Sequence, residues 1–374
     1  MLRLTRFLVV TISIAIISIV MIIFVLPTNI NYFSINSQIL DSGIQSFNKS
    51  IVPLDQIVSG GPPPDGIPSI DNPQFVSVEN AESFMDDSDL VLGVDINGDI
   101  RGYPLQILVW HEIVNDIVGE TPIAVTYCPL CFTNQIFNRT LLDGQTLELG
   151  TSGKLYNSNL VMYDRNTDSL WSQAMAQSIA GELSGTKLER IPFDLATWKD
   201  WKLIYPNSKM LSQDTGHARP YGADPYGDYY TNPDILFPVS NNDDNRLGVK
   251  EIVIGLEEEE ENRISKAYKL KDIEELKIIN DKLTENYAVT LWSTYPYMVR
   301  LFDPSLDGKE TLLTFHYDER KHVFIDNQTG SEWNFEGKST SGQLNGSSLS
   351  RLPFDQGFWF EWSTFHPDTK VYTR

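Results

Sequence analysis

The sequence predicts a strand-rich α+β protein with two tandem copies of one domain after an N-terminal transmembrane helix. Three observations predict this: a long uncharged N-terminal run, an internal repeat, and short apolar runs separated by turn residues. The 374-residue chain has 29 basic and 50 acidic residues, a formal net charge of −21. This acidic balance disfavours contact with a phosphate backbone, so no nucleic-acid partner is expected.

Residues 7–26 carry no charge, and a helix of that length spans roughly 30 Å, the thickness of a hydrocarbon core. Only Arg3 and Arg6 precede this run, so the positive end is expected to stay inside. We therefore expect residues 1–26 to be a single-pass anchor in the cell membrane, with the bulk of the chain extracytoplasmic. A cleaved signal peptide is the alternative.

Residues 27–72 include a run rich in proline and glycine, residues 59–66, which predicts an extended stalk. Beyond it, the C-terminal third repeats the middle of the chain. Residues 164–171 correspond in sequence to residues 326–333, and residues 190–194 correspond to residues 351–355. The repeat predicts these boundaries: copy one over 73–214, a connector over 215–250, and copy two over 251–374.

Each copy has the same expected plan, described here for copy one. The apolar run 91–96 leads into Asn97-Gly98, which predicts a hairpin. Residues 104–119 predict a helix, because proline stands at the start and glycine follows the end. A strand is expected over 123–127 and a short helix over 197–204. The remaining short strands are expected over 135–141, 146–149 and 160–163.

The repeat allows a comparison, because residues shared by both copies are expected to be scaffold and residues confined to copy one are candidates for chemistry. Cys128 and Cys131, the two cysteines of the chain, fall in copy one and have no counterpart in copy two. His111 and Glu112 are answered by Leu276 and Lys277. A leucine opposite His111 indicates a core-facing position, where an imidazole needs a hydrogen-bond partner or a metal.

The residues therefore predict a soft-metal or redox site for copper or zinc. Cys128 and Cys131 are the expected thiolate ligands, His111 the third and Met162 a weak fourth. Thiolate, imidazole and thioether ligands suit copper better than magnesium or calcium. The cysteine spacing supports zinc less well, since zinc sites normally use the C-x₂-C pair twice and this chain has it once.

Other interpretations of these residues stay open. A Cys128–Cys131 disulfide would make the protein a binding or interaction module without metal. A dithiol exchange site and a pair of free buried thiols are further interpretations. An enzyme could instead use a polar pocket in copy one, with Glu112 or Arg165 as candidate catalytic groups. Further expected pocket residues are Arg101, Tyr103, Ser152, Tyr156, Asn159 and Gln173. The sequence leaves open whether the protein is an enzyme, and which protein or small molecule is its partner.

Several runs together are similar to one uncharacterised family, domain-of-unknown-function family 3179, over about residues 60–374. The runs that carry the resemblance are residues 65–68, 101–104, 110–116, 126–131, 152–159, 162–165, 169–173 and 224–226. The resemblance implies no agreed activity, so it groups these residues without assigning a reaction. One departure is Phe132, where the family pattern usually has glycine after the second cysteine.

Overall fold

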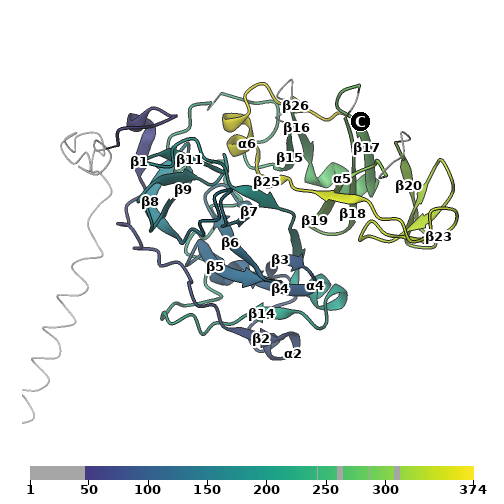
Figure 1. The fold of residues 1–374 in the computed structure, drawn as a ribbon, viewed down its shortest axis with the longest axis horizontal. Helices are drawn as coiled ribbons and strands as arrows, with labels where there is room; N and C mark the ends of the chain where they lie inside the picture. The colour runs from purple at the N-terminus through teal and green to yellow at the C-terminus, as the bar shows by residue number, and fades with distance from the viewer. Residues whose placement is uncertain (1–46, 242, 259–263, 286, 307–311) are drawn as a thin grey trace, which may run out of the picture. The chain divides into compact units, whose positions relative to one another are not determined.

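A computed structural model describes residues 47–374, apart from residues 242, 259–263, 286 and 307–311. In this part of the chain the strands form five sheets and the helices are short, which confirms the α+β class (Figure 1). The anchor expected over residues 7–26 lies outside the described residues. None of the described helices is long and apolar enough to cross a membrane.

The elements fall into a short leading group and two longer series. The leading group is η2 (Leu54–Gln56), β1 (Ile57–Ser59), β2 (Phe75–Ser77) and α2 (Val78–Ala81). The first series is β3 (Leu90–Ile96), β4 (Asp99–Pro104), α3 (Leu105–Leu108), β5 (Ile113–Val118), β6 (Thr121–Cys128), β7 (Thr133–Asn138), β8 (Leu149–Tyr156), β9 (Asn159–Asp164), β10 (Leu170–Ser172), β11 (Gln177–Ala180), β12 (Glu189–Ile191), β13 (Asp194–Thr197), α4 (Trp198–Ile204) and β14 (Lys209–Leu211). The second series is β15 (Ile252–Glu258), β16 (Ile264–Lys269), α5 (Leu270–Leu276), β17 (Ile278–Lys282), β18 (Ala288–Tyr295), β19 (Met298–Asp303), β20 (Phe315–Asp318), β21 (Val323–Asp326), β22 (Glu332–Trp333), β23 (Ser339–Ser341), β24 (Ser350–Leu352), β25 (Asp355–Phe358), α6 (Trp359–Phe365) and β26 (Lys370–Val371).

The two series have the same order of elements and the same strand pairings. The hairpin β3–β4 is flanked by antiparallel β13 and parallel β14, as β15–β16 is flanked by β25 and β26. Strands β5, β6, β7 and β12 pair in that order, as do β17, β18, β19 and β24. Strands β8–β11 and β20–β23 each form a meander.

Close packing of tryptophan on glycine recurs in both series. A Cβ added to Gly93 would lie 2.0 Å from the Trp201 ring, and one added to Gly255 would lie 2.2 Å from the Trp362 ring. No real Cβ atom makes contacts this short. The tryptophan of α4 therefore packs directly on the backbone of β3, and that of α6 on the backbone of β15. Trp201 and Trp362 are both buried accordingly.

The helix expected over residues 104–119 is wrong for most of its length. Helix α3 ends at Leu108, and Ile113–Val118 is strand β5, paired with β6 along its whole length. The β-branched residues of this run favour a strand. Gly119 and Glu120, with φ of +51° and +71°, form the turn of a hairpin, so Gly119 does not cap a helix.

The prediction of an extended stalk is also wrong for residues 47–72. Strand β1 pairs with β8 in antiparallel register, and Ile70 bridges to Val114. The Asp65 amide donates to the Thr151 carbonyl at 2.8 Å. The proline- and glycine-rich run after β1 contains no helix or strand, but its backbone groups still find partners on the first series.

The two series share one eight-stranded sheet, because β25 pairs with β7 through Gln356 and Asn134. A buried ion cluster lies beside this junction: Asp194 accepts from Arg300 at 2.6 Å and from Arg351 at 2.5 Å. These two guanidinium groups hold the pKa of the Asp194 carboxyl at about 2, against the opposing effect of burial.

We predict that Asp194→Asn lowers the free energy of unfolding at pH 7 by about 3 kcal/mol, because two guanidinium groups lose their buried counterion. The folded-state pKa is depressed below the ordinary 3.8, so this contribution is complete above about pH 4 and disappears as the pH falls towards 2. Urea unfolding of both proteins between pH 2.5 and 7 measures the difference.

Asp355→Asn is the matched control, because Asp355 begins β25 as Asp194 begins β13. Burial raises the pKa of the Asp355 carboxyl to about 6, and its Oδ1 is buried without a hydrogen-bond partner among the described residues. This substitution should therefore not destabilise the protein at pH 7. Equal destabilisation by the two variants would contradict the assignment of the ion cluster.

Candidate functional site

Both cysteines lie in the turn between β6 and β7, residues 128–133, which we name the Cys turn. The Cys131 amide donates to the Cys128 carbonyl at 3.2 Å. The turn brings the two Sγ atoms 3.4 Å apart as free thiols, and burial raises the pKa of the Cys131 thiol. The structure therefore has the reduced pair, and the disulfide stays a prediction for an oxidising compartment.

Phe132, the next residue of the Cys turn, has φ +56°. Glycine adopts this left-handed conformation freely, whereas a bulky residue there costs roughly 1–2 kcal/mol. This explains why glycine is the expected residue at this position. The Phe132 ring stacks on Phe358 of the second series, with centroids 5.5 Å apart and planes at 22°, so contacts across the junction of the two series offset part of the strain.

A buried polar network lies behind the thiols. The Asn159 side-chain amide lies 3.6 Å from Cys131 Sγ and donates to Thr133 and Gln173, each at 3.1 Å. The Gln173 amide donates to Thr126 Oγ1 at 3.0 Å. All these side chains are fully buried, so two expected pocket residues, Asn159 and Gln173, do lie beside the cysteines, but inside the protein.

His111 is fully buried and both of its ring nitrogens have partners. Nδ1 lies 2.7 Å from the Pro68 carbonyl, which can only accept, so Nδ1 carries the proton. Burial lowers the pKa of His111 to about 4, so Nε2 is unprotonated near neutral pH and accepts from the Tyr221 hydroxyl at 2.6 Å. His111 therefore connects residue 68 and the connector to the core of the first series.

His111, Cys128 and Cys131 do not form a group of three possible metal ligands in the described residues. Met162 lies in β9 opposite Thr151 and Trp171, within the main hydrophobic core. No cluster of three or more histidine, cysteine or acidic side chains that could hold a metal occurs within residues 47–374 as the structure describes them. Only the two thiols lie close together.

Glu112 lines a cavity that is lined by neither of the two cysteines. It is 9% exposed, and no hydrogen bond or ion pair to its carboxyl is found among the described residues. Burial alone raises its pKa to about 8, so the carboxyl is mainly protonated at neutral pH. Its φ of +59° is matched by φ +66° at Lys277, which shows that the backbone conformation does not depend on the carboxyl.

The cavity beside Glu112 has a volume of about 230 Å³, and we name it the Glu112 cavity. Five segments that are far apart in sequence meet there. They contribute Gly60, Pro62, Ile67, Glu112, Leu130, Thr151, Gly153, Lys154, Leu155, Leu160, Tyr226, Leu236 and Phe237. Leu130 belongs to the Cys turn, so this turn forms part of the cavity wall. Most lining side chains are apolar.

Sequence reasoning named Glu112 but missed its neighbours in this cavity. Ile67, Leu130, Gly153 and Tyr226 lie in four of the runs that carry the family resemblance. The signal was therefore present, but apolar and glycine residues have no chemistry that distinguishes them from scaffold in a single sequence.

The other expected pocket residues make structural contacts. Arg101 and Tyr103 both bond to Asp116, at 2.7 and 2.6 Å. Lys266 and Tyr268 bond to Asp281 in the same way, each at 2.6 Å. The arrangement recurs in the second series, as expected for scaffold.

Arg165 bonds to Asp65 at 3.0 Å and to Asp71 at 3.2 Å, and so fixes residues 65–71 against β9. Ser152 donates to the Val161 carbonyl within the β8–β9 pair. Tyr156 packs edge-on against Phe365, with centroids 5.8 Å apart. None of these three residues lines the Glu112 cavity.

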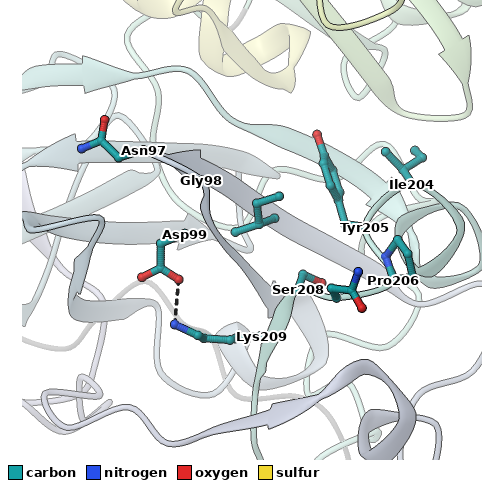
Figure 2. A pocket seen from close by; sticks show the side chains of 10 residues that line it. Asn97, Gly98, Asp99, Ile204, Tyr205, Pro206, Ser208 and Lys209 are labelled. Atoms are coloured by element: carbon teal, nitrogen blue, oxygen red, sulfur yellow. Dashed lines mark hydrogen bonds and ion pairs between the residues drawn. The ribbon is translucent and has the colours of Figure 1, made fainter.

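A separate hollow of about 480 Å³ lies between the β3–β4 turn and the residues after α4 (Figure 2). Lys209 Nζ and Asp99 Oδ1 form an ion pair of 2.9 Å across it. Tyr205 and Pro206 form another part of the lining. None of the candidate site residues lines this hollow, and we assign it no role.

The fold and the site define an α+β protein with a buried thiol pair and a protonated carboxyl at a small cavity. The chain belongs to the family described as "Protein of unknown function (DUF3179)", whose model matches residues 64–369. No curated protein and no solved structure matches the chain.

Proposed function

We propose that the protein binds a small neutral molecule in the Glu112 cavity and that Glu112 transfers a proton to or from it. The observation that carries this proposal is the meeting of five distant segments around one carboxyl whose pKa burial raises to about 8. A group that titrates near the working pH is suited to general acid–base chemistry.

The cavity wall supports the choice of a neutral ligand. Apart from Glu112 and Lys154 no charged side chain lines the cavity among the described residues, and a mostly apolar lining disfavours an additional charge. A protonated Glu112 can donate one hydrogen bond, so a carbonyl or hydroxyl oxygen on the ligand is its natural partner. A volume of about 230 Å³ suits a molecule smaller than the ligands of typical pockets.

We further propose that the two series are tandem copies of one domain, with copy one over 73–214 and copy two over 251–374. Their equal element order and pairing support this. Copy two has Lys277 where copy one has Glu112, and it has no thiol, so it would support the site without repeating it. The uncharged run 7–26 supports an extracytoplasmic location on a membrane anchor.

The proposal is tested by ligand-observed NMR with neutral cyclic amides and ketones of up to about ten non-hydrogen atoms. We predict that binding weakens at least tenfold as the pH rises from 6 to 10, because ionised Glu112 can no longer donate to the ligand oxygen. Glu112→Gln should make binding independent of pH over this range.

Two variants control this experiment. Leu236→Trp should block binding, because Leu236 lines the cavity from an exposed position where a larger ring can be placed without disturbing the core. Lys277→Gln should behave as the wild type, since it makes the matching change in the second series. No binding by the wild type, or binding that is unaffected by Leu236→Trp, would contradict the proposal.

A second candidate function is a soft-metal site for copper or zinc at the Cys turn. The 3.4 Å separation of the two Sγ atoms favours it, because one ion could be held by both thiolates. His111 would have to release at least the partner of its coordinating nitrogen, Tyr221 at Nε2 or Pro68 at Nδ1, to become a ligand. The thiols would also have to lose their protons on binding.

Elemental analysis of protein purified without chelator tests this second candidate. A bound ion predicts about one equivalent of copper or zinc in the wild type and its loss in Cys128→Ser. His111→Ala should retain the metal if the thiolates alone hold it. Metal-free wild-type protein, or metal that persists in Cys128→Ser, would exclude the Cys turn as the site.

A further inference from the structure

A second cavity lies at the junction of the two series and is lined by Phe132 of the Cys turn. Its volume is about 460 Å³, and we name it the Phe132 cleft. Its lining includes the side chains of Asp89, Phe132, Tyr230, Lys250, Tyr297 and Phe358. This cleft shares no lining residue with the Glu112 cavity, so the inference is independent of the proposed function.

Two aromatic residues that line the cleft occupy corresponding positions in the two series, and both have a left-handed backbone conformation. Phe132 immediately precedes β7 and has φ +56°, and Tyr297 immediately precedes β19 and has φ +63°. Bulky residues are rare in this conformation, which glycine adopts without strain. Both series therefore carry the same backbone strain, and in both it accompanies an aromatic ring in the same cleft.

The two rings form separate walls. Phe132 is fixed by stacking on Phe358 and by edge contacts with Tyr127 at 6.1 Å and Tyr230 at 6.2 Å. The Tyr297 backbone is fixed on both sides, by Glu274 at 2.8 Å and by Gln356 at 3.1 Å. Both residues line the cleft, and no ring contact joins Phe132 to Tyr297 among the described residues.

The cleft also contains one cationic side chain. Lys250 Nζ lies 3.2 Å from the centre of the Tyr229 ring and donates to the Tyr229 carbonyl. It forms no direct ion pair with any carboxylate that the structure describes. Burial lowers its pKa, and the more distant carboxylates Asp234 and Asp228 oppose that effect. The lining also contains two carboxyl groups, each held by a hydrogen bond: Asp89 accepts from Gln106 at 2.9 Å, and Asp224 accepts from the Tyr226 amide at 2.8 Å.

We propose that the Phe132 cleft binds a planar aromatic molecule that carries an acidic group. The ring lies between the Phe132 and Tyr297 walls, where offset or edge contacts between rings are favourable. The acidic group pairs with Lys250, whose ammonium group has no direct ion pair among the described residues. A cleft of this size holds one or two fused rings.

Isothermal titration of the full chain with 2-naphthoate tests this proposal. The acid should bind the wild type, and cyclohexanecarboxylate, which has no aromatic ring, should bind at least tenfold more weakly. Phe132→Gly should weaken 2-naphthoate at least tenfold, because it removes one wall and leaves a residue suited to the backbone. Tyr297→Gly makes the same test on the opposite wall if Phe132→Gly does not fold.

Two controls separate the ring from the charge. Lys250→Gln should weaken 2-naphthoate but leave the neutral 2-naphthylmethanol unchanged. Glu120→Gly places glycine at a left-handed residue outside the cleft and should not affect binding. Equal binding of cyclohexanecarboxylate, tighter binding of 2-naphthylmethylamine, or full binding by both glycine variants of the cleft would overturn the proposal.

Discussion

The arrangement of both cavities depends on the hydrogen bond that the Phe358 amide donates to the Cys131 carbonyl at 2.8 Å. This bond fixes the Cys turn of the first series to β25 of the second series. Leu130 then faces the Glu112 cavity, and Phe132 faces the cleft at the junction. A turn of six residues thus contributes a lining residue to each cavity, and its two thiols are buried.

The part of the fold that could be predicted follows from local patterns. The Asn97-Gly98 hairpin and the helix at residues 198–204 have strong turn and capping signals, and the structure contains both. Residues 113–118 were mistaken for helix because Gly119 suits a hairpin turn as well as a helix end. Residues 47–72 were mistaken for a stalk because their partners are distant in sequence, on β8 and β5.

The sequence predicted which residues belong to the candidate site better than it predicted which of them lie together. Cys128 and Cys131 lie together as expected, and Glu112 stands out by its burial. His111 was expected beside the thiols, yet it bonds to Pro68 and Tyr221, because the sequence could not show which loops cover it. The closure of the Glu112 cavity by Tyr226 of the connector is likewise a long-range contact that no local pattern encodes.

The central claim is that Glu112 stays protonated near neutral pH, and a ¹³C NMR titration of protein labelled at glutamate carboxyls measures it directly. The account predicts one resonance that titrates with a pKa of about 8 and is missing from the spectrum of Glu112→Gln. If the resonance lost in that variant titrates near the ordinary value of 4.5, the carboxyl is ionised at neutral pH and the proposed acid–base role is wrong.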